Sequence, residues 1–102
     1  MPLTSKQRAQ LRALASSEDT IVHVGKGGLG ENIITQMRDA LKARELVKGR
    51  VLESSMLSAR EACDALAEAC RAEAVQVIGS KFVLYKRNEL KPKIELIKAS
   101  KK

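Results

Sequence analysis

Aromatic residues are almost absent from this chain of 102 residues, which has no tryptophan and only one phenylalanine and one tyrosine, Phe82 and Tyr85. Both stand in a segment typical of a strand, where successive side chains alternate between the two faces. Their odd spacing therefore places them on opposite faces, and we expect one of them in the core. Such a pair cannot form the aromatic platform on which nucleic-acid bases stack.

Cysteine and histidine are also scarce. Cys63 and Cys70 lie in one predicted helix, seven positions apart, which separates their Cα atoms by about 10 Å, beyond the limit of about 7 Å for a disulfide. His23 is the only histidine, so the chain has no zinc-binding set of cysteine and histidine. We expect two buried thiols that only pack, a histidine without a metal-binding role, and no cofactor.

Long apolar runs and catalytic constellations are missing too. No run approaches the roughly 18 apolar residues of a membrane span, and the first residues lack the apolar stretch of a signal peptide. We therefore expect a cytoplasmic protein that binds no membrane. Neither a nucleophile beside a base nor a pair of facing carboxylates is evident, so we do not expect an enzyme.

Positive charge is what the chain has in excess, with a formal net charge of +7, and such an excess favours polyanionic partners. Residues 75–102 contain eight lysines and arginines against two acidic residues, whereas residues 58–74 contain two against four. One region is therefore suited to phosphate groups and the other is not.

Helical periodicity and turn residues predict the element order αβαβαββ. Thr4 with Gln7, and Ser58 with Glu61, are capping boxes that begin the first and third helices. The predicted helices cover about 3–16, 30–44 and 58–72, and the strands about 20–24, 45–54 and two arms of a hairpin around Gly79 within 74–87. Crossovers of this length make the first three strands parallel and the last antiparallel.

The prediction is thus a single compact α/β domain with a four-stranded mixed sheet over residues 1–88. Residues 89–102, which are basic and interrupted by Pro92, form a C-terminal tail that we expect to be loosely held.

The stretch "VGKGGLGEN", residues 24–32, carries four glycines within six positions between a predicted strand and a predicted helix. Gly25, Gly27 and Gly30 match a dinucleotide-binding turn, but that fold needs two βαβαβ halves and this chain has at most one. Alternatively, Gly25 to Gly28 form a G-x-x-G loop that clamps a nucleic-acid backbone, with Lys26 at its tip. A purely structural turn, with Gly30 as the helix cap, stays open as a third interpretation.

Cations on the predicted second strand add to this pattern. Lys48 and Arg50 share one face of the strand. They are either part of a binding surface or an ordinary solvated face, and the sequence alone leaves both open.

Five stretches of the chain, in this order and spacing, resemble the bacterial single-domain YhbY-type proteins of the CRM family, named for chloroplast RNA splicing and ribosome maturation. They are "LTSKQRAQLRALA", "VHVGKGGLGENII", "DALKARELVKGRVL", "SAREACDALAEAC" and "VQVIGSKFVLYKR". The resemblance covers residues 3 to about 87. It implies an RNA-binding domain related in fold to the C-terminal domain of translation initiation factor three.

The resemblance also implies a partner and a site. Bacterial members associate with precursors of the large ribosomal subunit and are thought to assist its maturation through ribosomal RNA. The family's G-x-x-G loop falls on Gly25, Lys26, Gly27 and Gly28, and the neighbouring cations implied as RNA contacts are Arg44, Lys48, Arg50 and Lys81. Gly30 departs from the family pattern, in which a serine or threonine commonly caps the helix.

We expect a monomer that contacts the RNA by backbone, shape and charge. The alternative is an adaptor that binds a protein on assembling ribosomes, with a glycine loop that serves only the fold. A nucleotide-dependent enzyme is the third possibility.

Overall fold

The computed structural model describes residues 3–88, 90, 92–94 and 96. The elements follow the predicted order, and their bounds are α1 (Ser5–Ala15), β1 (Thr20–Val24), α2 (Glu31–Arg44), β2 (Leu46–Val51), α3 (Ala59–Cys70), β3 (Glu73–Ile78) and β4 (Lys81–Tyr85). Within the part of the chain that the structure describes, none of these helices is long and apolar enough to cross a membrane.

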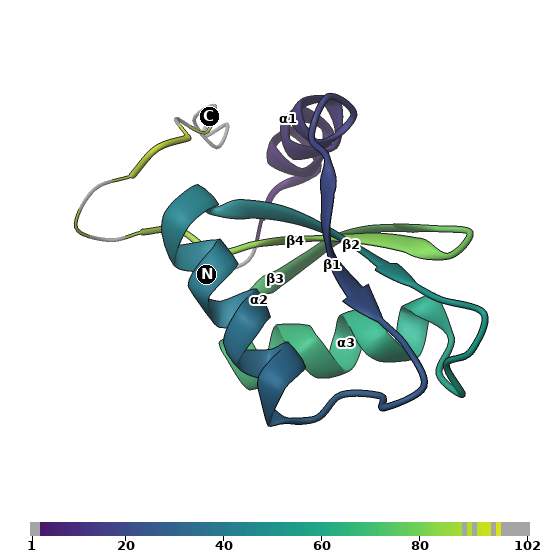
Figure 1. Ribbon diagram of the computed structural model, residues 1–102. Coiled ribbons are helices and arrows are strands. Elements are labelled where there is room, and N and C mark those ends of the chain that lie inside the picture. Colours follow the sequence, from purple (N-terminus) through teal and green to yellow (C-terminus); the bar gives the residue numbers. More distant parts are fainter. Residues whose placement is uncertain (1–2, 89, 91, 95, 97–102) are drawn as a thin grey trace.

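The four strands form one mixed sheet in the order β1-β2-β4-β3 (Figure 1). β1 and β2 are parallel, whereas β4 is antiparallel to both β2 and β3. The predicted α/β fold, the mixed sheet and the hairpin of the last two strands are therefore confirmed. β3 does run in the same direction as β2, as predicted, but β4 lies between them.

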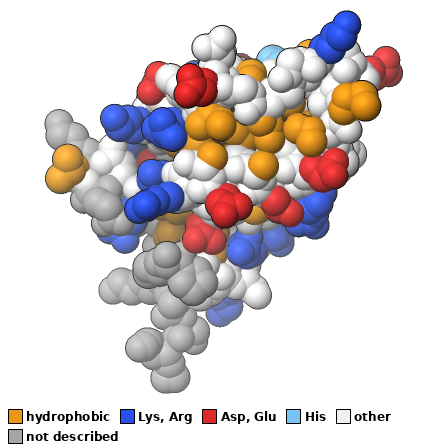
Figure 2. All heavy atoms as spheres, turned by 90° about the horizontal axis from the view of Figure 1, so that it is seen from below, with side chains coloured by type: hydrophobic (Ala, Val, Ile, Leu, Met, Phe, Trp, Pro, Cys, Tyr) orange, Lys and Arg blue, Asp and Glu red, His pale blue; other side chains and the backbone are white. Residues whose placement is uncertain are grey.

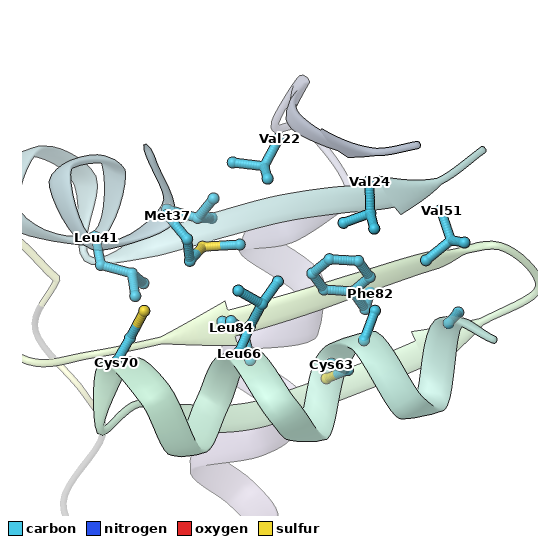
Figure 3. Packing of buried hydrophobic residues seen from close by; sticks show 13 residues of the cluster. Val22, Val24, Met37, Leu41, Val51, Cys63, Leu66, Cys70, Phe82 and Leu84 are labelled. Carbon is cyan, nitrogen blue, oxygen red and sulfur yellow. The ribbon is translucent and has the colours of Figure 1, made fainter. Parts of the chain in front are cut away.

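Helices cover both faces of the sheet, with α1 on one face and α2 and α3 on the other (Figure 1). Under α2 and α3, side chains such as Met37, Leu66 and Phe82 form the larger core (Figure 3). On the opposite face, Leu11 of α1 packs in a smaller cluster that contains Tyr85. Both aromatic residues are thus buried, and the expectation of a single core aromatic is wrong because helices shield both faces.

The two predicted capping boxes are present. The Thr4 hydroxyl accepts a hydrogen bond from the main-chain N–H of Gln7 at 3.1 Å, and the Gln7 side chain accepts one from Thr4 at 3.0 Å. Ser58 and Glu61 exchange the same pair at 3.1 and 2.9 Å. Each box satisfies two amide groups that would otherwise lack partners at the first turn of its helix.

Part of the C-terminal tail is anchored on a buried carboxylate. Glu45, fully buried between α2 and β2, accepts main-chain hydrogen bonds from Asn88, Lys93 and Ile94 at 2.7, 2.8 and 2.7 Å. Ile94 and Leu96 also pack against the cluster under α1. The expectation of a loosely held tail is therefore wrong for these residues.

Candidate nucleic-acid interface

The glycine loop is a tight turn. The N–H of Gly28 donates a hydrogen bond to the carbonyl of Gly25 at 3.0 Å, which closes a four-residue turn. Lys26 and Gly27 stand exposed at its tip. Gly28 has a φ of 70°, a conformation that side chains with a Cβ rarely adopt, so the fold itself requires glycine at this position.

The backbone conformation does not require glycine at Gly27. A Cβ at Gly27 would meet no atom within 4 Å, and one at Gly25 would make only ordinary contacts, the nearest 3.5 Å from Leu52. Positive φ among the loop glycines is confined to Gly28. The loop could therefore fold with a side chain at Gly27. The absence of that side chain leaves open space over the main chain beside Lys26.

The turn lies at the edge of the sheet where β1, β2 and β3 end (Figure 1). The N–H of Leu52 donates to the carbonyl of Val24 at 2.8 Å, and the N–H of Val51 donates to the carbonyl of Ser80 at 2.8 Å. These bonds connect the end of β2 to the start of the glycine loop and to the β3–β4 turn. Three loops are thereby gathered at one edge.

A row of exposed side chains crosses all four strands next to this edge. The paired positions are His23 with Arg50, Arg50 with Lys81, and Lys81 with Ile78. Residues at paired positions project from the same face of a sheet, so Arg50 and Lys81 are neighbours. This face is the one that carries α1, and Lys48 lies on it two positions before Arg50.

The cations at this edge are not neutralised. Among residues 3–88, Lys26, Lys48, Arg50 and Lys81 form no ion pair with a carboxylate. Arg44 differs, because its guanidinium pairs with Glu18 at 3.6 Å and it precedes β2 rather than lying near its end. Of the four cations predicted outside the glycine loop, Lys48, Arg50 and Lys81 therefore lie together, whereas Arg44 lies apart from them.

A shallow groove lies on the same face, beyond the last turn of α1. Its lining comes from α1, β2, β3 and β4 and consists of Arg12, Ala15, Ser16, Lys48, Gln76, Ile78, Lys81, Phe82 and Val83. No pattern in the sequence marks Arg12 or Gln76 as part of the site. Gln76 of β3 lines the groove because the strand order sets it opposite Val83, and Val83 opposite Lys48. Arg12 joins them from the last turn of α1.

The opposite face of the molecule has a different character. Exposed carboxylates project from α3 at Glu61, Asp64 and Glu68, as the acidic segment predicts. Seen from this side, acidic and basic side chains border a band of hydrophobic ones (Figure 2). The side covered by α2 and α3 therefore carries exposed carboxylates among its cations.

The two thiols are free and buried in the core, as expected. Burial, with a smaller effect from the neighbouring Asp64 carboxylate, raises the pKa of the Cys63 thiol from 9.0 to about 11. Burial likewise raises the pKa of Cys70. A thiol with a raised pKa is a poor nucleophile at neutral pH. Over the described residues, no group of three or more His, Cys, Asp and Glu side chains could hold a metal ion.

Together, the fold and this edge define a small basic α/β domain with a mixed four-stranded sheet and an exposed glycine turn. Beside the turn lies a cationic row, formed by Lys48, Arg50 and Lys81, that has no ion pair with a carboxylate of residues 3–88. The CRS1/YhbY (CRM) domain model matches residues 3–86. The chain belongs to this family.

Individual relatives agree with this assignment. A Bacillus subtilis protein named probable RNA-binding protein YqeI is 42% identical over 94 residues, which are 92% of this chain and 98% of that protein. A Haemophilus influenzae protein named RNA-binding protein is 32% identical, over 92% of this chain and 94% of its own length. The solution structure of a Staphylococcus aureus protein, described as a candidate RNA-binding protein, is 45% identical with a TM-score of 0.78, over 94% of this chain and 100% of that chain.

Proposed function

We propose that this protein binds folded ribosomal RNA in precursors of the large ribosomal subunit and assists the assembly of that subunit. The observation that carries the proposal is the position of Arg50 beside Lys81 on an exposed face, at the sheet edge where the Gly25–Gly28 turn lies. The names of the relatives support RNA as the partner.

The glycine turn would take the RNA backbone. Open space over Gly27 lets a phosphate approach the main chain, and Lys26 beside it supplies a positive charge. The dipole at the start of α2 is equivalent to roughly half a charge, but the carboxylate of Glu31 already lies in that first turn. Lys26 and the strand cations therefore supply most of the attraction.

The strand cations would extend this contact along the RNA. Lys48, Arg50 and Lys81 have no carboxylate partner among the described residues, so no intramolecular ion pair has to break before they meet phosphates. Contacts of this kind fix the position of an RNA and depend little on base identity. The proposed activity is thus recognition by charge and shape, without catalysis and without a cofactor.

The glycine turn is tested by the double variant Lys26→Asp and Gly27→Ala, which keeps Gly28 because its φ of 70° requires glycine. We expect its affinity for naked ribosomal RNA fragments, measured by fluorescence anisotropy, to fall by about 30-fold, or about 2 kcal/mol. Lys6→Asp is the matched control, because it reverses one exposed charge in the first turn of α1 and should cost less than about threefold.

Thermal unfolding of both variants shows whether the domain stays folded. If the folded double variant binds RNA like the wild type, the turn serves only the fold. If the wild-type protein binds no naked RNA, the adaptor alternative replaces this proposal.

Salt provides an independent test. Four phosphate contacts, one for each of Lys26, Lys48, Arg50 and Lys81, predict a slope of log affinity against log salt near −3. Affinity should then fall by about 60-fold between 50 and 200 mM salt. The measurement is a titration series in potassium chloride, and a binding constant that does not respond to salt contradicts the mechanism.

A further inference from the structure

The groove beside the cationic row combines apolar and polar groups in a way that phosphate binding alone does not require. Ala15 and Val83 are buried and form its apolar base, while Ile78 keeps 64% of its surface exposed at the rim. Ile78 pairs with Lys81 of the neighbouring strand, so this exposed isoleucine places an apolar surface next to a cation at the rim. It suggests an occupant with an apolar surface.

The remaining lining groups are polar and complementary to a nucleotide. Arg12, Lys48 and Lys81 contribute three positive charges, and no carboxylate of the described residues lines the groove. Gln76 offers both a hydrogen-bond donor and an acceptor. The guanidinium of Arg12 is planar and can stack on a base. An acidic peptide segment could pair with the charges, but it offers no planar base on which Arg12 can stack between two flanking phosphates.

We propose that this groove binds one unpaired nucleotide of the RNA, with the base against Ile78 and Arg12 and the flanking phosphates near Lys48 and Lys81. The inference rests on the proposed function and adds a preference for RNA that has an unpaired base beside its helix. The groove volume of about 390 Å³ is at the lower end of the range for small-ligand sites, which suits a single nucleotide.

Base pairing decides which RNA can use the groove. A paired base is stacked within the helix, so it cannot bring an apolar face and a hydrogen-bonding edge into a shallow groove. A bulged base can do both. The sheet edge would hold the helix backbone while the groove takes the extruded base, and the protein would select junctions and bulges rather than uninterrupted helices.

The test compares two fluorescein-labelled RNA hairpins that differ by one bulged adenosine in the stem. We expect the wild-type protein to bind the bulged hairpin about fivefold more tightly by fluorescence anisotropy, a little less than stacking on an aromatic side chain provides. Ile78→Ser should abolish this preference and leave the affinity for the fully paired hairpin within about twofold. Gln76→Ala, which changes a second lining group, should reduce the preference as well.

Leu90→Ser is the matched control, since it makes a similar change at a residue that is 93% exposed and does not line the groove. It should retain the full preference. Equal binding of both hairpins by the wild-type protein overturns the nucleotide site and leaves the proposed function standing. Failure to bind either hairpin overturns both. A preference that survives Ile78→Ser and Gln76→Ala places the unpaired base elsewhere and also overturns the inference.

Discussion

Replacing Gly49 by alanine is expected to destabilise the domain by about 2 kcal/mol, a typical cost of adding a group to a filled core. Gly49 lies in β2 opposite Phe82 of β4. A Cβ at Gly49 would lie 2.4 Å from Cζ and 2.6 Å from Cε1 of the Phe82 ring. The ring is 1% exposed and packed in the core between the sheet and α3 (Figure 3), so it cannot move aside without displacing its neighbours.

Urea unfolding measures this effect, and the melting temperature should fall by about 10 °C. Gly27→Ala is the matched control, because the same methyl group there meets open space and should change stability by less than about 0.5 kcal/mol. In the double variant Gly49→Ala with Phe82→Leu, the smaller side chain makes room for the methyl group. Its cost should be less than the sum of the two single variants. Strict additivity contradicts this account.

Glu45→Gln should have an effect of similar size, about 2 to 3 kcal/mol, for a different reason. One carboxylate oxygen accepts from Lys93 and Ile94, and the other accepts from Asn88. The glutamine side chain has nearly the same shape but only one acceptor oxygen. In either orientation, its NH₂ group therefore faces a main-chain N–H, and a buried donor loses its partner.

Two measurements follow this change. Urea unfolding reports the loss of stability, and hydrogen exchange at the amides of Lys93 and Ile94 should become faster because their acceptor is lost. Glu18→Gln is the control, since it weakens only the exposed pair with Arg44, and such pairs contribute less than about 1 kcal/mol. Unchanged amide exchange in Glu45→Gln means that the carboxylate does not hold the tail.

The features that the sequence predicts correctly are those that depend on residues close together along the chain. The capping boxes at Thr4 and Ser58 place the helix starts because each involves groups only three positions apart. The Gly79 hairpin is similarly local. Glu45 shows the limit, since its partners lie more than 40 positions away and nothing in its own neighbourhood marks a glutamate for burial.

The candidate site divides in the same way. The Gly25–Gly28 turn can be recognised from the sequence as a motif, because its hydrogen bond joins an amide and a carbonyl only three positions apart. The adjacency of Arg50 and Lys81 depends on β4 lying beside β2, a pairing between segments about 30 positions apart that no local pattern specifies. Arg44 is as basic as Arg50 in the sequence, and its separation from the cationic row becomes visible only in the folded chain.

The central position of β4 also governs when the domain can form during synthesis. A nascent chain that ends before Lys81 contains the β1–β2 pair and β3, but not the strand that hydrogen-bonds to both. It therefore exposes the main-chain edges of β2 and β3, which are prone to pair with other chains. The cationic row is likewise incomplete, because Arg50 lacks its neighbour. The sheet and its proposed RNA surface can therefore be completed only after Tyr85 has been added.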